Sequence, residues 1–293
     1  MRKWLEAGIL GALQFQPFPS SPVRGSYRGD MMTRRVSRWA LTMLALVIGA
    51  CTKETPVVET AGECADVNQG QICTWARMKG DSVVDVGATV AMASIENAPA
   101  EGMMHWPPPP SAALKLPAAV EQQTGLTHLT VFWEAMGHPP GPYLTPHFDF
   151  HFYTVSSEAR MAIDCADLTK PTALASGYSL PDVPLPPPMA EMTGTATLVG
   201  LCVPTMGMHS LPTTELEGTS PFRGTMVIGY NKGQPVFLEP MITKAMLMEK
   251  SAFDLPIPAI PGLSGNYPHS FHADYDAQQG TYRFVFSGFA SGT

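Results

Sequence analysis

Polar and apolar residues alternate strictly over "HFDFHFY", residues 147–153. The polar positions are His147, Asp149 and His151, and the aromatic positions between them are Phe148, Phe150 and Phe152. In a β-strand successive side chains point to opposite faces, so the pattern predicts one aromatic face and one face of imidazoles and a carboxylate. We expect the aromatic face to pack into a core. The polar face is either a functional site or the solvated side of a sheet.

Other apolar stretches are short and have the composition of strands. Residues 126–134 alternate and are rich in β-branched and aromatic residues, and residues 196–203 are a further strand candidate. Residues 222–241 and 270–289 each predict a hairpin, because "YNKGQ" and "DAQQG" lie at their centres and contain residues that tight turns favour.

Helical segments are few, and proline-rich runs separate the strands. Residues 156–164, which begin with a serine cap, and residues 243–251 predict short helices. Proline runs at 107–110, 180–188 and 255–262 favour extended loops. We therefore expect a mainly β protein: a single antiparallel β-sandwich or barrel-like domain with one or two short helices and Pro-rich loops.

The N-terminal region has the pattern of an export signal. Arg34, Arg35 and Arg38 precede the apolar run "WALTMLALVIGA" (39–50), which Cys51 follows. This order is typical of a signal peptide, and the run is too short to cross a ~30 Å hydrocarbon core comfortably. The ending "IGAC" resembles the bacterial lipobox, so we expect Cys51 to be lipidated. An ordinary cleaved signal with an incidental cysteine is the alternative.

These features divide the chain into four parts. We expect a non-native N-terminal extension at 1–30, a lipoprotein signal peptide at 31–51, a flexible tether at 52–63 and a β-rich domain at 64–293. The lipid anchor would then attach the protein to the bacterial cell envelope. Thr52 gives no reason for retention at the inner membrane, which favours the outer membrane with the domain facing the periplasm.

The charge of the exported part argues against a nucleic-acid partner. Residues 1–51 hold seven of the 18 Lys and Arg and two of the 25 Asp and Glu. The remainder therefore has 11 basic and 23 acidic side chains, a net charge near −12. Binding to nucleic acid would require a basic face.

The cysteines agree with export. Besides Cys51 the chain has Cys64, Cys73, Cys165 and Cys202, an even number that predicts two disulfides in an oxidising compartment. Three pairings are possible. The local choice is Cys64–Cys73, which leaves Cys165–Cys202. Free buried thiols are the alternative, and the spacings fit no zinc ribbon.

The polar face of residues 147–153 predicts a metal site. Residues two apart in a strand are ~6.6 Å apart and residues four apart ~13 Å, so one ion would take Asp149 with His147 or His151 unless the strand bends. Further ligands must come from elsewhere. His209 in "VPTMGMHSLP" and Glu239 in "VFLEPM" are the best candidates. Histidines with a carboxylate are a common ligand set for zinc, iron or manganese.

Other histidines have weaker signals. His138, in the loop sequence "GHPPGPY", is a weaker candidate because loop histidines are often exposed. We interpret the remaining four as structural or surface residues: His105, His128, His269 and His272.

Four segments resemble a family of exported bacterial proteins that is classed as a domain of unknown function. The segments are "GHPPGPYLTPHFDFHFY", "VPTMGMHS", "FRGTMVIGYNKGQPVFLEPMIT" and "YRFVFSGF", and the resemblance extends over about residues 65–290. One thermophile member of that family forms an oligomeric ring. The resemblance therefore implies a single β-rich domain and ring-like self-association, and it favours treating His147, Asp149, His151, His209 and Glu239 as one constellation. It implies no particular reaction.

Two classes of function follow. The first is a lipid-anchored envelope protein with a His/carboxylate metal site, whose metal would activate water or polarise a carbonyl. The chain has no nucleophile elbow, P-loop or dinucleotide fingerprint, so no nucleotide cofactor is expected, and the small-molecule ligand is unknown. The second is a non-enzymatic structural, binding or sensing lipoprotein in which the same residues form a hydrogen-bond network.

Overall fold

The computed structural model describes residues 54–102, 105–218, 222–263 and 266–289. The chain divides into two units, Met1–Thr52 and Lys53–Thr293, and all described residues belong to the second. The predicted extension (1–30), the signal peptide (31–51) and the lipidation residue Cys51 lie outside the described residues. Among the residues that are described, no helix has the length and apolar character needed to cross a membrane.

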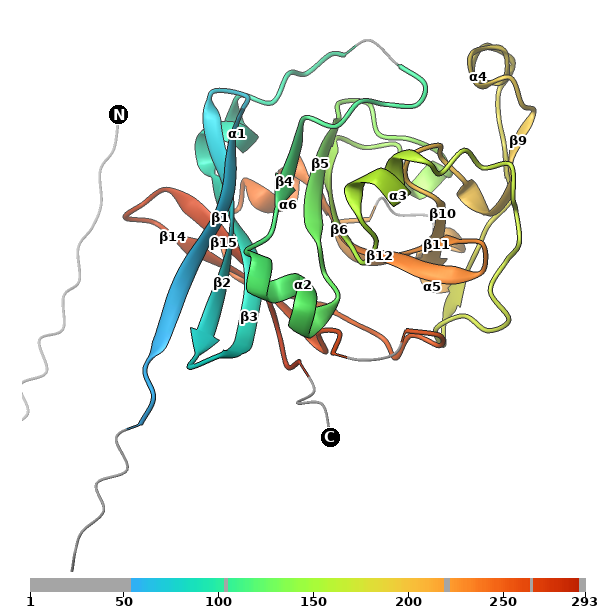
Figure 1. The fold of residues 1–293 in the computed structure, drawn as a ribbon. Coiled ribbons are helices and arrows are strands. Elements are labelled where there is room, and N and C mark those ends of the chain that lie inside the picture. The colour runs from blue at the N-terminus through green and yellow to red at the C-terminus, as the bar shows by residue number, and fades with distance from the viewer. Residues whose placement is uncertain (1–53, 103–104, 219–221, 264–265, 290–293) are drawn as a thin grey trace, which may run out of the picture. The chain divides into compact units, whose positions relative to one another are not determined.

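Two antiparallel sheets form the body of the protein (Figure 1). The first has six strands in the order β1 (Val57–Val67), β2 (Gly70–Lys79), β3 (Ser82–Ala91), β15 (Thr281–Ser287), β14 (Ser270–Asp276) and β13 (Phe253–Pro256). The second has seven in the order β4 (Ala112–Lys115), β5 (His128–Glu134), β6 (His147–Tyr153), β12 (Gln234–Thr243), β11 (Gly224–Asn231), β10 (Met208–Pro212) and β7 (Tyr178–Ser179). A separate pair joins β8 (Val183–Pro184) and β9 (Thr197–Leu198).

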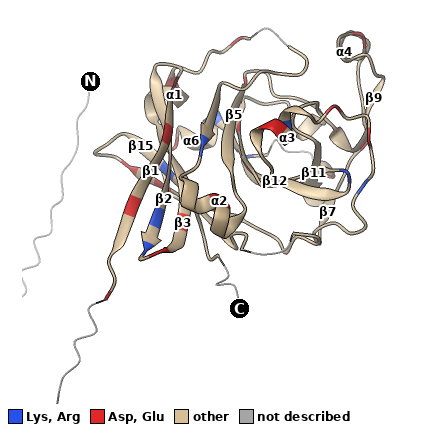
Figure 2. Ribbon diagram, in the orientation of Figure 1, with Lys and Arg blue, Asp and Glu red and all other residues tan. Residues whose placement is uncertain are grey.

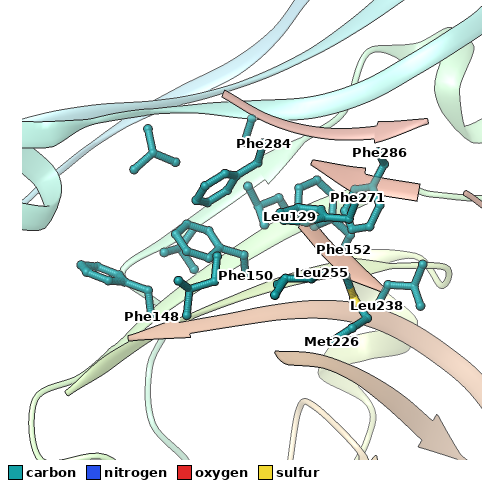
Figure 3. Close-up of a cluster of buried hydrophobic side chains, with 14 of the residues drawn as sticks. Leu129, Phe148, Phe150, Phe152, Met226, Leu238, Leu255, Phe271, Phe284 and Phe286 are labelled. Atoms are coloured by element: carbon teal, nitrogen blue, oxygen red, sulfur yellow. The ribbon is translucent and has the colours of Figure 1, made fainter. Parts of the chain in front are cut away.

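The sheets pack face to face through aromatic side chains. Figure 3 shows the phenylalanines of β6 directed toward those of β14 and β15. The rings of Phe150 and Phe284 have centroids 4.9 Å apart, and those of Phe152 and Phe286 are 4.8 Å apart. Each such burial stabilises the fold by ~1.5–3 kcal/mol before entropy is counted. The predicted antiparallel sandwich and the aromatic face of residues 147–153 are confirmed, and the described strands close into no barrel.

Both predicted hairpins are present, as β11–β12 and β14–β15. The strand predicted at 196–203 is mostly wrong. Thr197–Leu198 pairs in β9 and Val203 forms an isolated bridge with Gly207. Between them the chain turns through a 3₁₀ helix, η2 (Val199–Leu201), in which Gly200 has φ +59°. Its apolar residues cover a sheet instead of extending one.

The tether predicted at 52–63 is wrong for residues 57–63, which belong to β1. This strand pairs with β2 from Val57 opposite Lys79 to Val67 opposite Gly70. Almost all of its side chains are exposed or half-buried, because β1 is an edge strand held mainly by backbone hydrogen bonds. A strand without a buried face has no apolar alternation, so its sequence reads as a polar linker.

Helices are short, and the described residues contain six of them instead of the one or two predicted. They are α1 (Met92–Glu96), α2 (Ala118–Thr124), α3 (Ser157–Met161), α4 (Pro187–Thr193), α5 (Thr213–Leu216) and α6 (Lys244–Leu247). The two predicted ones are α3 and α6, which begin at side-chain caps: Ser156 Oγ accepts from Ala159 N–H and Thr243 Oγ1 from Met246 N–H. The other four have no side-chain cap, so this sequence signal is missing.

Both predicted disulfides are present. Cys64–Cys73 links the paired strands β1 and β2, with Cα atoms 4.1 Å apart. Cys165–Cys202 joins the loop after α3 to the residue that follows η2, with Cα atoms 6.0 Å apart. The second bridge therefore fastens the segment that lies over the seven-stranded sheet.

A second apolar cluster covers the outer face of the seven-stranded sheet. Phe132, Tyr153 and Phe237 from the sheet pack there with residues of the segment 183–206, including Leu201 and Met206. Both faces of the central strand β6 are consequently buried. Figure 2 shows Lys and Arg spread singly along the ribbon.

Candidate metal centre

All seven residues of β6 are buried, so its polar face is not the solvated side of a sheet. His147, Asp149 and His151 are 0%, 5% and 1% exposed. They point away from the phenylalanine core, into the layer between the sheet and the segment 183–206. Burying polar groups in this way is costly unless partners satisfy them.

Glu239 reaches this layer from the neighbouring strand. The register of β12 against β6 pairs Leu238 with Phe152 and Met241 with Asp149, which places Glu239 beside His151. Glu239 is 1% exposed, and its Oε2 lies 3.4 Å from His151 Nε2. The carboxylate of Glu239 is therefore buried and faces an imidazole.

His209 comes from β10, and a glycine makes room for its approach. Register places His209 opposite Gly229, and Gly229 opposite Phe237. A Cβ at position 229 would collide with the ring of Phe237, so only glycine lets that ring lie across β11. His209 packs on the Phe237 ring, with centroids 5.1 Å apart, and its Nε2 lies 3.5 Å from His151 Nε2.

One ligand group thus consists of His151, His209 and Glu239, whose nearest nitrogen and oxygen atoms all lie within 4.8 Å of one another. With metal–ligand bonds of ~2.1 Å, tetrahedral geometry places two ligand atoms about 3.4 Å apart. The spacings of 3.4 and 3.5 Å around His151 Nε2 match that value.

A second ligand group consists of His138, His147 and Asp149. His147 Nε2 lies 3.2 Å from Asp149 Oδ1, and His138 Nε2 lies 3.9 Å from Asp149 Oδ2. The prediction of one constellation of five residues is therefore wrong, because the structure divides them between two groups. The alternation along β6 indicates a shared face and carries no information on how its three polar residues are divided.

His138 is the residue whose role sequence reasoning underestimated. The loop from β5 to β6 folds back tightly at Gly137, which has φ +67° and where a Cβ would meet backbone atoms of Tyr143 and Thr145. His138 N–H donates to the Tyr143 carbonyl at 3.2 Å, which fixes the loop. The glycine and prolines of "GHPPGPY" indicate a loop with a fixed conformation. They do not indicate which part of the protein the loop contacts.

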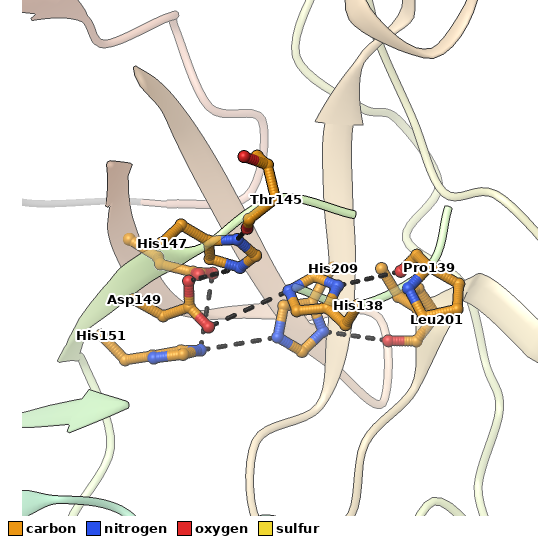
Figure 4. Close-up of polar contacts among 9 residues, drawn as sticks. His138, Pro139, Thr145, His147, Asp149, His151, Leu201 and His209 are labelled. Atoms are coloured by element: carbon orange, nitrogen blue, oxygen red, sulfur yellow. Dashed lines mark hydrogen bonds and ion pairs between the residues drawn. The ribbon is translucent and has the colours of Figure 1, made fainter. Parts of the chain in front are cut away.

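Three of the histidines have their tautomer set by the backbone (Figure 4). His138 Nδ1 lies 2.9 Å from the Pro139 carbonyl, His147 Nδ1 2.6 Å from that of Thr145, and His209 Nδ1 2.9 Å from that of Leu201. Because a carbonyl oxygen only accepts, each Nδ1 must carry the proton and donate it. In a neutral ring the Nε2 atom is then a lone pair, and all three lone pairs face the centre. Metal-binding histidines typically show this arrangement.

Burial keeps these imidazoles neutral. It lowers the pKa of His209 to about 4 and those of His147 and His151 well below their usual value, with neighbouring imidazoles contributing further. Burial also lowers the pKa of His138. A neutral imidazole with a free Nε2 is the form that binds metal ions.

The carboxylates show the opposite shift for the same reason. Burial, and then the charge of Glu134, raises the pKa of Asp149 well above its usual value. Burial, followed by Asp149 and Glu134, does the same for Glu239. Burial raises the pKa of Glu134 itself to about 7. Three carboxyl groups therefore lie close enough to disfavour one another's ionisation.

Several of the inward-facing atoms have no hydrogen-bond partner: His147 Nε2, Asp149 Oδ1 and Glu239 Oε2. His147 Nε2 and Asp149 Oδ1 are in contact, and with the carboxyl group ionised both are acceptors, so no hydrogen bond joins them in that state. Each unsatisfied buried polar group costs ~1–3 kcal/mol. A cation at the centre of each group would satisfy these atoms together.

A pocket of about 230 Å³ reaches the centre from outside. His138, Asp149 and His209 lie in its wall together with Glu134, and apolar side chains such as Trp106 and Met189 form much of the remainder. A small molecule in the pocket would therefore meet atoms of both ligand groups.

The histidines interpreted as structural or surface residues lie outside both ligand groups. His128 is buried against the Tyr153 ring, with centroids 4.8 Å apart. His272 is half-buried on the other sheet and contacts Asp254 at 2.7 Å. His105 is exposed but borders the pocket, which its sequence did not indicate.

The fold and the site together define a β-sandwich protein with a buried histidine–carboxylate centre that a pocket connects to the surface. No protein-family model, curated protein or solved structure matches the chain. The resemblance to the exported family stays a prediction, and the function has to be argued from this chain's own residues.

Proposed function

We propose that the protein is a lipid-anchored protein of the bacterial cell envelope that binds a divalent transition metal, zinc, iron or manganese, through His151, His209 and Glu239. The observation that carries this proposal is that hydrogen-bond acceptor atoms of three side chains face one another. His209 presents a lone pair to His151, and His151 Nε2 also faces the carboxylate of Glu239. If His151 Nε2 carried a proton, it would be shared between two acceptors at 3.4 and 3.5 Å, whereas one metal ion would bind all three groups.

Metal-activated chemistry fits this site better than a structural metal does. Three protein ligands leave a fourth position for water, as in catalytic zinc sites, whereas structural zinc sites are closed by four protein ligands. His209 lines the pocket, so the open position is accessible to a small molecule. A bound ion would lower the pKa of its water to ~7 or polarise a carbonyl oxygen. The reaction class that we propose is therefore metal-assisted hydrolysis.

The alternative function is a structural, binding or sensing lipoprotein in which the same residues form a hydrogen-bond network. Such a network requires donors, which here would be the protonated carboxyl groups of Asp149 and Glu239 and the ring N–H of His151. The Nδ1 protons of His138, His147 and His209 are all donated outward to backbone carbonyls. This alternative predicts a metal-free protein with the same compact centre.

Elemental analysis of the purified protein tests the proposal. We expect a stoichiometric transition metal in the wild type and its loss in His209→Gln, with the circular dichroism spectrum unchanged. His272→Gln is the matched control, because His272 is half-buried on the other sheet, outside both ligand groups. A wild type that binds no zinc, iron or manganese, even when reconstituted, would refute the metal and favour the hydrogen-bond network.

The location and assembly are separate parts of the proposal. The lipobox-like "IGAC" supports an anchor at Cys51, and two disulfides suit an oxidising compartment. Cys51→Ala should release the protein from the outer-membrane fraction or leave an unprocessed precursor, and unchanged fractionation would contradict the anchor. Ring-like self-association is tested by light scattering of the detergent-solubilised protein.

A further inference from the structure

The second ligand group lies directly beside the first. His147, Asp149 and His151 follow one another on the same face of β6, and Figure 4 shows the Asp149 carboxylate between the two imidazoles. Asp149 presents Oδ1 to His147 and Oδ2 to His138. The group has the same composition as the first, two histidines and one carboxylate. Two of its four inward-facing atoms, His147 Nε2 and Asp149 Oδ1, are buried without a hydrogen-bond partner.

The charges around the centre are compatible with two divalent ions. Three carboxyl groups converge: Asp149 and Glu239 in the two ligand groups, and Glu134, which is opposite His147 on β5. A divalent ion beside each carboxylate would favour its ionised form. Three carboxylates and one hydroxide would then balance two ions, so the geometry of the second group carries the inference.

We propose that the centre holds two adjacent divalent transition-metal ions, the second bound by His138, His147 and Asp149. This inference rests on the proposed function, because the first ion is the one bound by His151, His209 and Glu239. Two-metal centres of this kind polarise a substrate oxygen and generate a nucleophile together. The pocket, whose wall contains His138, Asp149 and His209, reaches both ions.

The two positions should differ in affinity. The side chains of the first group are almost fully buried, whereas His138 is 29% exposed and its Nε2 is 3.9 Å from Asp149 Oδ2. The second group is therefore the less enclosed and the more widely spaced of the two. We expect the second ion to bind more weakly and to be lost first on dialysis.

Titration of the chelator-treated full chain with Zn²⁺, followed by calorimetry, tests the inference. The wild type should bind two ions in two steps, His138→Gln should bind one with the tighter affinity retained, and His272→Gln should bind two. In the Mn²⁺-loaded wild type, electron paramagnetic resonance should show two coupled ions, and in His138→Gln a single uncoupled one. His138 is on a loop, so its replacement is expected to leave the fold intact, which circular dichroism checks.

The outcomes separate this inference from the proposed function. One ion in the wild type, retained in His138→Gln, overturns the two-ion centre and leaves the first site in place. Loss of all metal from a folded His138→Gln also overturns it, because both groups would then share one ion. A wild type that binds no ion overturns both proposals.

Discussion

His151 and His209 are 58 residues apart in the chain, and their Nε2 atoms lie 3.5 Å apart in a buried layer. Both rings are neutral, because burial lowers the pKa of both imidazoles. His209 Nε2 is an acceptor because Nδ1 donates to the Leu201 carbonyl. Two neutral rings and the Glu239 carboxylate at this spacing are arranged to bind a cation. The predictions below follow from that arrangement.

Removing the metal should lower thermal stability. An ion at 100 times its Kd stabilises the folded state by ~2.7 kcal/mol, and in a domain of this size 1 kcal/mol corresponds to ~2–4 °C in Tm. We therefore expect chelator treatment to lower Tm by ~5–10 °C, measured by calorimetry, and added metal to restore it. His209→Gln should show a much smaller response. Equal Tm values with and without chelator in the wild type would contradict the prediction.

Glu239→Gln should stabilise the metal-free protein at high pH. Burial and the neighbouring Asp149 raise the pKa of Glu239, so between about pH 4.5 and that raised value the folded state holds a proton that the unfolded state has lost. The contribution of Glu239 to stability therefore falls as pH rises through this window, whereas glutamine is unaffected. We expect the variant to be more stable by ~1–3 kcal/mol at pH 8 and equal to the wild type near pH 4.

Urea denaturation in the presence of chelator at the two pH values measures this difference. Glu217→Gln is the control, because Glu217 is an exposed glutamate and its replacement should have no effect at either pH. With metal present the order should reverse, since the variant lacks the anionic ligand. A variant less stable than the wild type at pH 8 without metal would show that the carboxylate has a protein partner.

Gly229→Ala should weaken metal binding from a distance. The added methyl group would collide with the Phe237 ring, against which the His209 ring packs. Displacing the ring should cost ~1–3 kcal/mol of stability and reduce metal affinity ~10–100-fold, as loss of supporting contacts commonly does. Gly141→Ala is the matched control, because a Cβ there meets no atom within 4 Å. Unchanged affinity in Gly229→Ala would mean that Phe237 does not position His209.

Much of the fold was predictable because it depends on local patterns. The alternation of residues 147–153 predicts the aromatic core face, and "YNKGQ" and "DAQQG" predict the two hairpins. β1 was not predictable from the same signals, since an edge strand that buries almost no side chain has no alternation. Helix α4 was not predictable from the sequence, because Pro186 at its start provides no side-chain cap.

The candidate site was predictable in its members but not in its arrangement. His209 and Glu239 lie at strand positions that "MGMHS" and "FLEPM" mark, and the structure brings both to His151. The division into two groups depends on contacts between strands, such as Phe237 over Gly229, which no single segment specifies. His138 joins Asp149 only because its loop folds back over β6.

The two disulfides should have different effects on the centre. Cys202 directly follows Leu201, whose carbonyl accepts the Nδ1 proton of His209 at 2.9 Å. The bridge to Cys165 therefore holds the residue that fixes the His209 tautomer. Cys64–Cys73 lies on the other sheet, between β1 and β2. Only the Cys165–Cys202 bridge should influence metal affinity.

Double replacement by serine tests this difference. The chain-entropy model assigns ~4 kcal/mol to Cys165–Cys202, which closes a loop of 37 residues, and ~3 kcal/mol to Cys64–Cys73, which closes one of nine. Cys165→Ser/Cys202→Ser should lose stability and also bind zinc ~10-fold more weakly or worse in a chelator competition assay. Cys64→Ser/Cys73→Ser should lose stability alone. Equal zinc affinity in the two folded variants would show that the backbone at Leu201 keeps its position without the bridge.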